Sequence, residues 1–228
     1  MTSVWAASIG LMYFERVPRD RPIAVLLRHA ERDSLPDGDA GNAVKITEEG
    51  RRLAEYLGSA LGARLRTLHS SPVLRCLQTA EAVREGAKAE LPIQSNRLLG
   101  DPGIFVRDGD LAWQNWVALG HAGVMQWLIS GQERLPGMAA PKPAAHALVR
   151  HMVSLAGNEV GIHLFVTHDS VLAEVVGRLL RPIIDSADGP HFLEGLLAWK
   201  EGRNIHVGFR ESRGKFFAAG NASGLVVS

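Results

Sequence analysis

Two short and mostly apolar runs, each followed at once by polar side chains, constrain the fold of this 228-residue chain more than any other feature. Ile23–Leu27 precedes Arg28-His29, and Ile162–Val166 precedes Thr167–Ser170. Apolar runs of this length, bounded by breaks, are typical of strands buried on both faces of a parallel sheet. Helices must cover both faces of such a sheet, so we expect an α/β protein.

Helical patterns separate the predicted strands. Thr47 before Glu48-Glu49 predicts a helix N-terminus, and the apolar residues that follow recur at helical spacing as far as Gly62. A strand is predicted over 65–69, and Ser70-Ser71-Pro72 supplies N-cap and first-turn chemistry for a helix through about Val83. The remaining predicted elements are helices over 111–132, 144–156 and after Asp169, a Pro-rich loop over 136–143, and a terminal hairpin of 196–199 with 205–209.

This order of elements predicts a three-layer α/β sandwich with a mostly parallel central sheet flanked by helices. The middle third of the chain lacks clear strands. We therefore expect a single domain over 1–228, with a helical cap insertion at about 101–156.

Charge and composition exclude several classes of partner. The chain has 25 Lys and Arg against 24 Asp and Glu, so it offers no general attraction to nucleic acid or to anionic lipid. The longest uncharged stretch, 111–132, includes polar side chains that would be costly in a membrane. The apolar first fourteen residues raise the question of a signal peptide, but no basic residue precedes them and no convincing cleavage site follows. We expect a cytoplasmic protein in which the lone Cys76 is buried and unpaired.

Polar residues of one chemical kind follow three of the predicted strands. They are Arg28-His29, the segment Ser70 to Arg75, and His168-Asp169. The carboxyl ends of parallel strands meet at one edge of a sheet, so we expect these side chains, including the rings of His29 and His168, to share a pocket. Guanidinium groups match phosphate oxygens and keep their charge, so the pocket is predicted to hold a phosphate.

At these residues the sequence resembles the histidine phosphatase superfamily, which includes phosphoglycerate mutases, acid phosphatases and phytases. The matching motifs are Arg28-His29-Ala30-Glu31-Arg32, the segment from Ser71 to Glu81, and Val166-Thr167-His168-Asp169. The resemblance extends from about Ile23 to Leu180. The family usually has Gly where Ala30 stands. Three motifs in the expected order are far more specific than any one of them.

The resemblance implies a phosphatase that forms a phosphohistidine on His29 and releases phosphate to water. Arg28, Arg32, Arg75 and His168 would bind the phosphoryl group, and His168 would also stabilise the transition state. Arg32 could equally pair with Glu31 or Asp33. Ser71 could contribute a hydroxyl to the site, but we expect it to cap a helix. No metal or cofactor is implied. The expected substrate is a small-molecule or protein phosphomonoester, and the sequence does not indicate an oligomeric state.

Two carboxylates are candidates for the general acid. In the acid phosphatase and phytase branch the donor directly follows the second histidine, which corresponds to Asp169. In the mutase-like branch it lies about two dozen residues after the second motif's arginine, where this chain has Gly100 at the expected position and Asp101 one residue later. Asp169 is the first choice and Asp101 the second. Asp169 could also be a helix N-cap.

Three alternative functions follow from the same residues. One is a non-catalytic module that binds a phosphorylated ligand, another is a mutase-type phosphotransferase, and the third is a metal-dependent hydrolase built on His168-Asp169. The last would need further ligands, and the remaining histidines lack tight metal-ligand spacing. Trp113, Trp116 and Trp127 are predicted to pack in the core, although they could line a pocket instead.

Overall fold

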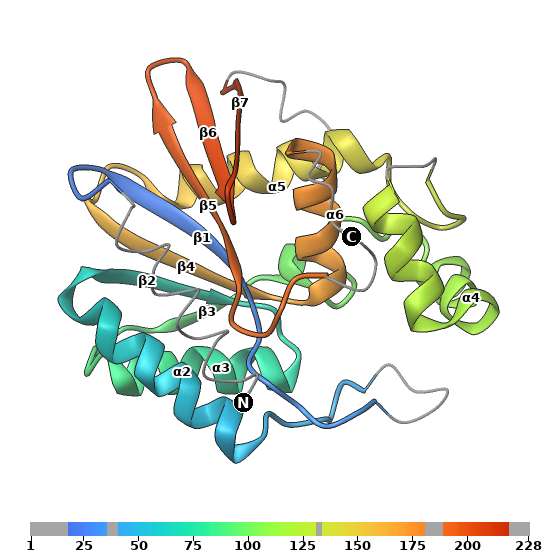
Figure 1. Ribbon diagram of the computed structural model, residues 1–228, viewed down its shortest axis with the longest axis horizontal. Helices are drawn as coiled ribbons and strands as arrows, with labels where there is room; N and C mark the ends of the chain where they lie inside the picture. Colours follow the sequence, from blue (N-terminus) through green and yellow to red (C-terminus); the bar gives the residue numbers. More distant parts are fainter. Residues whose placement is uncertain (1–17, 36–40, 131–133, 181–188, 219–228) are drawn as a thin grey trace.

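The computed structural model describes residues 18–35, 41–130, 134–180 and 189–218. The apolar residues 1–14, for which the sequence raises the question of a signal peptide, lie outside this part of the chain. The described residues form one sheet with helices on both faces (Figure 1). None of the helices in these four ranges is long and apolar enough to cross a membrane.

The sheet has seven strands and is mixed. In chain order the elements are β1 (Pro22–Arg28), α2 (Glu48–Leu61), β2 (Leu65–Ser70), α3 (Leu74–Gly86), β3 (Ile93–Ser95), α4 (Gly109–Ser130), α5 (Pro141–Ala156), β4 (Gly161–Thr167), α6 (Asp169–Leu179), β5 (Gly195–Glu201), β6 (Asn204–Phe209) and β7 (Ser212–Phe217). The strand order is β3-β2-β4-β1-β5-β6-β7. The first four of these strands are parallel, and β5, β6 and β7 extend the sheet in antiparallel fashion.

The register of the parallel strands fixes where the polar motifs meet. Arg28 at the end of β1 pairs with Thr167 at the end of β4, and Ser70 at the end of β2 pairs with Val166. The three strands therefore end at the same edge of the sheet. The residues that follow them in the sequence emerge side by side, as expected for ligand sites in open α/β sheets.

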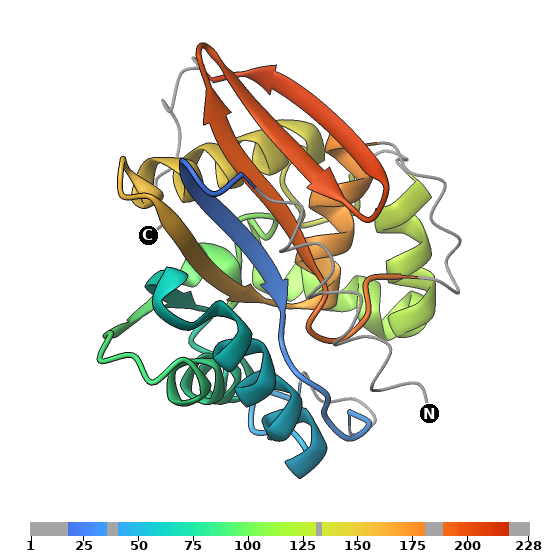
Figure 2. The ribbon, with the colours of Figure 1, turned by 60° about the vertical axis from the view of Figure 1, so that its left-hand side comes forward.

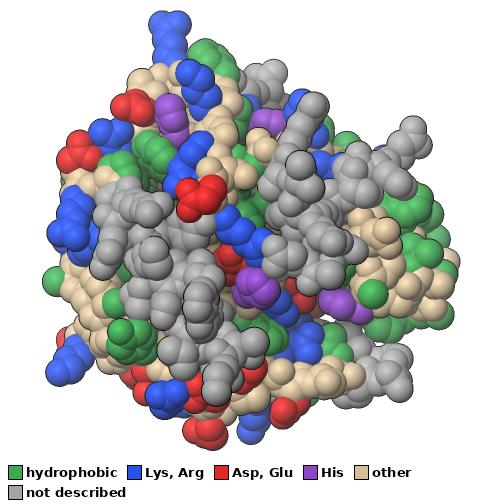
Figure 3. Space-filling view, in the orientation of Figure 1, with side chains coloured by type: hydrophobic (Ala, Val, Ile, Leu, Met, Phe, Trp, Pro, Cys, Tyr) green, Lys and Arg blue, Asp and Glu red, His purple; other side chains and the backbone are tan. Residues whose placement is uncertain are grey.

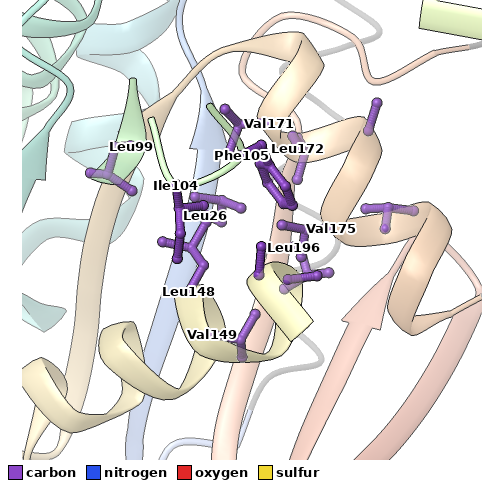
Figure 4. Packing of buried hydrophobic residues seen from close by; sticks show 14 of the residues in the cluster. Leu26, Leu99, Ile104, Phe105, Leu148, Val149, Val171, Leu172, Val175 and Leu196 are labelled. Atoms are coloured by element: carbon purple, nitrogen blue, oxygen red, sulfur yellow. The ribbon is translucent and has the colours of Figure 1, made fainter. Parts of the chain in front are cut away.

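The sheet has a separate apolar core on each face. Ile23, Val25 and Leu27 of β1 pack toward α2 and α3, whereas Ala24 and Leu26 pack toward α5 and α6. Figure 2 shows the two helix pairs on opposite sides of the sheet, and Figure 4 shows part of the core beneath α5 and α6. Strands buried on both faces explain the apolar runs, and the predicted three-layer α/β class is confirmed.

Several predicted element boundaries are confirmed by the structure, and others are wrong. The Thr47 side chain caps α2 by accepting from the Gly50 amide, as expected, which typically stabilises a helix by about 1 kcal/mol. In contrast, α3 begins at Leu74 with Val73 as its N-cap, so the serines before it do not cap this helix. Helix α5 begins at Pro141, inside the predicted loop, because proline fits the first turn of a helix.

Two short strands escaped prediction. The three-residue strand β3 pairs only with β2, and it is too short to show an apolar pattern. The edge strand β7 pairs with β6 and carries Arg213 and Lys215 on its exposed side. Charged edge strands resist pairing with other chains, so their sequences lack the apolar content on which prediction depends.

The segment predicted to form a cap divides into two parts in the structure. Helix α4 changes direction at Gly120, whose backbone φ is +65°, and it packs next to α6 beyond the edge of the sheet (Figure 1). Helix α5 instead packs on β1 and β5 as part of a helix layer. The insertion therefore supplies one helix outside the layers and one within them, and its role as a cap stays a prediction.

Candidate active site

The rings of His29 and His168 lie next to each other at the edge where β1 and β4 end. The His29 amide donates to the Thr167 carbonyl and so extends the β1–β4 ladder by one residue. The two ring centroids are 5.7 Å apart, with the rings at 68° to each other. Both side chains are buried and line one cavity. The structure therefore brings together the two histidines that the sequence placed after separate strands.

The hydrogen bonds of His29 fix which ring nitrogen is free to react. Its Nδ1 lies 2.7 Å from the Ala30 carbonyl oxygen, which can only accept, so Nδ1 carries the proton. Its Nε2 accepts from the Arg75 Nε at 3.2 Å and is therefore unprotonated. Burial lowers the pKa of His29 well below its usual value, and the nearby His168, Arg28 and Arg75 lower it further. His29 is thus a neutral imidazole with its unprotonated nitrogen facing a guanidinium.

Arg75 joins the two histidines from the first turn of α3. Its guanidinium donates to His29 Nε2, to His168 Nδ1 at 3.1 Å and to the Gly41 carbonyl at 2.7 Å. The side chain is buried and lies at the pocket wall. Because an arginine remains charged there, Arg75 places a fixed positive charge between the two rings.

His168 is held by contacts on both of its ring nitrogens. Since Nδ1 accepts from Arg75, the proton of the neutral ring is on Nε2, which donates to the Ser71 hydroxyl at 3.0 Å. Burial and then Arg75 lower the pKa of His168 to about 3. The buried thiol of Cys76 lies 3.6 Å from Nε2. Ser71, for which the sequence favoured helix capping, is therefore a direct neighbour of the site.

Arg28 and Asp169 form an ion pair beside the histidines. Arg28 Nη2 lies 3.0 Å from an Asp169 carboxylate oxygen, and the guanidinium stacks 4.0 Å from the ring centroid of Phe192. His121, on α4, approaches the same carboxylate with its Nε2 at 3.6 Å. Burial alone would raise the pKa of Asp169, but Arg28 and then His121 hold it well below its usual range. The carboxylate is therefore ionised while these partners are in place.

Two guanidinium nitrogens near the site have no hydrogen-bond partner among the described residues. The Nε atoms of Arg28 and Arg32 are both buried without a hydrogen bond. Arg32 lines the cavity, and its Nη1 donates to the Asp33 carbonyl at 2.7 Å. A buried and unsatisfied donor is costly unless a ligand supplies an acceptor. The arrangement is therefore suited to an anion that presents several oxygen atoms.

Gly100 and Asp101 lie at the opposite wall of the pocket. The Thr167 hydroxyl donates to the Leu99 carbonyl at 2.6 Å and ties this loop to the end of β4. A Cβ on Gly100 would lie 2.5 Å from His168 Nε2, and the φ of +154° also favours glycine. The loop therefore cannot place a carboxylate at position 100 without moving His168. Asp101 is exposed and lines the cavity, whereas Asp169 is buried.

One cavity of about 650 Å³ connects these residues. Most of the sequence-predicted site residues line it, namely His29, Arg32, Arg75, Asp101, His168 and Asp169, whereas Arg28 reaches the site through its ion pair with Asp169. Figure 3 shows histidine, basic and acidic side chains close together near the middle of one face. No sequence motif indicates that His121 lies here, because its position depends on how α4 packs.

The other residues considered from sequence lie in different surroundings. Trp113 is 38% exposed and lines the cavity, so the expectation that it packs in the core is wrong for this residue. Trp116 and Trp127 are partly buried against the core, and Trp116 also lines the cavity. Across the described residues, no group of three or more His, Cys, Asp or Glu side chains is placed to hold a metal ion.

Comparison with known sequences supports the resemblance seen in the motifs. Residues 24–101 match the family model described as histidine phosphatase superfamily (branch 1). This segment includes His29, Arg75 and Asp101 but ends before His168. No curated protein sequence matches the chain.

Solved structures share the fold along most of the chain. A structure titled mycobacterial hydrolase 2 has a TM-score of 0.55 at 19% identity and covers 91% of this chain and 94% of its own. The native structure of a mycobacterial glucosyl-3-phosphoglycerate phosphatase has a TM-score of 0.54 at 19% identity, with 86% and 96% covered. A phosphoserine phosphatase from Entamoeba histolytica, a mutant in complex with phosphoserine, has a TM-score of 0.56 at 14% identity, with 83% and 96% covered. The fold is therefore that of these phosphatases.

Proposed function

We propose that this chain, which carries the motifs and the fold of the histidine phosphatase superfamily, hydrolyses a small-molecule or protein phosphate monoester through a phosphohistidine on His29. The observation that carries the proposal is the state of this imidazole. Its Nδ1–H is committed to the Ala30 carbonyl, which leaves the Nε2 lone pair beside the Arg75 guanidinium. A neutral nucleophile held next to a fixed positive charge is suited to attack a bound phosphoryl group.

In the first step, His29 Nε2 forms a bond to phosphorus as the bond to the ester oxygen breaks. The leaving alkoxide takes a proton from the general acid. In the second step, a water oxygen attacks the phosphohistidine, the P–N bond breaks, and the water proton returns to the same carboxylate. Inorganic phosphate leaves, and His29 regains its lone pair.

The phosphoryl oxygens would be bound by groups that already converge on this point. Arg75 now donates to both imidazoles, and a phosphate placed between the rings would accept those hydrogen bonds instead. The Nε of Arg32, which lines the cavity, offers a further donor. Arg28, held against Asp169 behind the wall, would add its positive charge. His168 would give its Nε2 proton to a phosphoryl oxygen in place of Ser71. These donors would stabilise the charge that is spread over the oxygens in the transition state.

Asp169 remains the first choice for the general acid, with Asp101 as the second. Asp169 is ionised in the free protein because Arg28 lies 3.0 Å away. A phosphate dianion beside it would disfavour a second negative charge and so favour protonation. Asp101 is more exposed. An ionised Asp169 has no proton to give to a leaving group. This observation favours the second candidate function, a module that binds phosphorylated ligands without turnover.

The decisive experiment is turnover of 4-nitrophenyl phosphate combined with trapping of the intermediate. An aryl leaving group hardly needs the acid, so hydrolysis is expected whichever carboxylate donates. Rapid quenching in base should give a peptide that contains His29 with one added phosphoryl group. Chelator should leave the rate unchanged. A protein that binds phosphate but never turns over this ester would contradict the proposal and support a binding module.

A further inference from the structure

The cavity is much larger than a phosphoryl group. Its volume of about 650 Å³ is in the range of pockets that enclose a whole drug-sized ligand. The histidines and Arg75 occupy one end of it. The rest, which we call the α4 chamber, is lined by apolar side chains: Phe105, Trp113, Trp116, Val117, Leu128 and Met138. The substrate class therefore depends on what this chamber accepts.

One face of α4 points into the chamber rather than into the core. Trp113, Trp116, Val117 and Gly120 follow the i, i+3, i+4, i+7 spacing that places residues on one side of a helix, and all four line the cavity. Val117 is 70% exposed and Trp113 is 38% exposed. Hydrophobic side chains also gather at the edge of the molecule where Figure 1 places α4 (Figure 3). An apolar face that is open to a cavity has area available for a ligand.

The charges along the cavity favour an uncharged ligand in this chamber. Among the described lining residues, the arginines are Arg32 and Arg75, and Arg75 contacts both histidines. The acidic lining residues are Asp101, Asp169 and Glu174, of which Asp169 pairs with Arg28 and Glu174 with Arg178. No lysine is among the described residues of the wall, and its His121 lies 3.6 Å from the Asp169 carboxylate. A substrate carboxylate beyond the phosphate would therefore meet no additional guanidinium on this wall and would lie near Asp101.

We propose that the group esterified to the phosphate is a bulky apolar one, an aryl group or an alkyl chain of about six carbons, that lies in the α4 chamber. This inference rests on the proposed function for the phosphate end of the pocket. It separates the chain from neighbours titled for glucosyl-3-phosphoglycerate and phosphoserine, because both of those compounds carry a carboxylate near the phosphate.

Binding of alkylphosphonates tests the inference without requiring turnover. We would measure the dissociation constants of methyl-, butyl- and hexylphosphonate by calorimetry, with 3-phosphonopropionate as the carboxylate-bearing match for butylphosphonate. Affinity should rise about twofold to fourfold per methylene group as the chain enters the chamber. The carboxylate of 3-phosphonopropionate would be unpaired in the chamber. Butylphosphonate should therefore bind at least tenfold more tightly, a difference of about 1.4 kcal/mol.

Variants of α4 then locate the effect. Trp113→Ala should reduce the ratio of hexyl- to methylphosphonate affinity by about tenfold, because about 1.4 kcal/mol of apolar contact is lost. Leu119→Ala is the matched control, since Leu119 is equally exposed on the same helix but does not line the cavity. Its ratio should stay at the wild-type value. Thermal unfolding of both variants checks that they remain folded.

The outcomes separate this inference from the proposed function. A flat series, or tighter binding of 3-phosphonopropionate than of butylphosphonate, would overturn the apolar substrate class even in a protein that hydrolyses 4-nitrophenyl phosphate. If Trp113→Ala and Leu119→Ala reduced the ratio of hexyl- to methylphosphonate affinity equally, the α4 chamber would not be the cause of the preference for long chains. If no phosphonate bound at all, the phosphate site itself would be wrong, and both proposals would fail together.

Discussion

The two ends of the cavity are built in different ways. At the phosphate end, His29, Arg75 and His168 are buried and joined by direct hydrogen bonds. In the α4 chamber, Trp113 and Val117 are partly or largely exposed and contribute through shape and apolar area. The first end has fixed polar geometry, whereas the second is an open apolar wall. Under the proposed function, chemistry and substrate choice would therefore be separate properties of this pocket.

The contrast has its origin in the connectivity of the chain. The phosphate end is made by residues that directly follow β1, β2 and β4, whose pairing aligns Arg28 with Thr167 and Ser70 with Val166. The chamber is made by α4, which packs on α6 and changes direction at Gly120. Strand register fixes the members of the first set relative to one another, whereas the second set depends on how one helix packs.

Removal of the proposed nucleophile should have the largest effect and is confined to the phosphate end. His29→Ala is expected to lower kcat for 4-nitrophenyl phosphate by about 10⁴-fold or more, because no other group can form the covalent intermediate. The fold should persist, since His29 lies beyond the apolar run of β1. His206→Ala, in the antiparallel half of the sheet, is the control and should retain activity. Retained turnover in His29→Ala would contradict the assignment.

Two variants decide which of the two candidate carboxylates is the proposed general acid. Asp169→Asn should lower kcat for an alkyl phosphate by about 10²-fold to 10³-fold, with a much smaller loss for an aryl phosphate that leaves without protonation. Asp101→Asn should not change the alkyl-to-aryl ratio. Because the alkyl and aryl rates are compared within one variant, a general loss of activity caused by the broken contact with Arg28 cancels in their ratio. The reverse result would transfer the role to Asp101.

A methyl group added at Gly100 should disturb the phosphate end, because the loop that carries Gly100 forms the opposite wall of the pocket. Gly100→Ala places a Cβ 2.5 Å from His168 Nε2, so the ring or the loop must move. A displacement of about 1 Å in an active site can cost roughly 100-fold in rate, and we expect a loss of tenfold to a hundredfold in kcat/KM on that basis. Gly109→Ala, whose Cβ would meet nothing within 4 Å, is the control. Equal rates in both variants would show that His168 can shift without consequence.

The phosphate end could be predicted from sequence to a much greater extent than the chamber. The apolar runs indicated the strands, and the residues after them had to emerge at one edge of the sheet. In contrast, the contact of His121 with Asp169 and the exposure of Trp113 depend on how α4 packs, and the local pattern of α4 is equally compatible with a core helix. Ser71 was ambiguous because a hydroxyl before a helix can cap it or bond elsewhere, and here it bonds to His168.

The ionisation of Asp169 also could not be predicted from its place in the sequence. A carboxylate after a strand and at a helix start suits both a proton donor and a helix cap. Its state in the structure follows from Arg28, whose guanidinium comes from another strand and is oriented by Phe192. Side-chain geometry of this kind is set by packing, so sequence motifs predict which groups meet but not their protonation.

The smallest effect is expected for the protonation of His29 between pH 7.5 and 5.5. This test concerns the burial of His29, on which the comparison between the two ends of the cavity depends. An imidazole with the usual pKa of about 6.5 would be only about one tenth neutral at pH 5.5. Burial, with His168, Arg28 and Arg75, lowers the pKa of His29 well below that value, so the neutral nucleophile should persist as the pH falls from 7.5 to 5.5. NMR titration of the His29 ring, assigned with His29→Ala, should show no transition in this range, while the same ring in denaturant should titrate normally. A folded-state transition near pH 6.5 would mean that water and protons enter the phosphate end as freely as the α4 chamber, and the division of the cavity into a buried chemical end and an open apolar end would no longer hold.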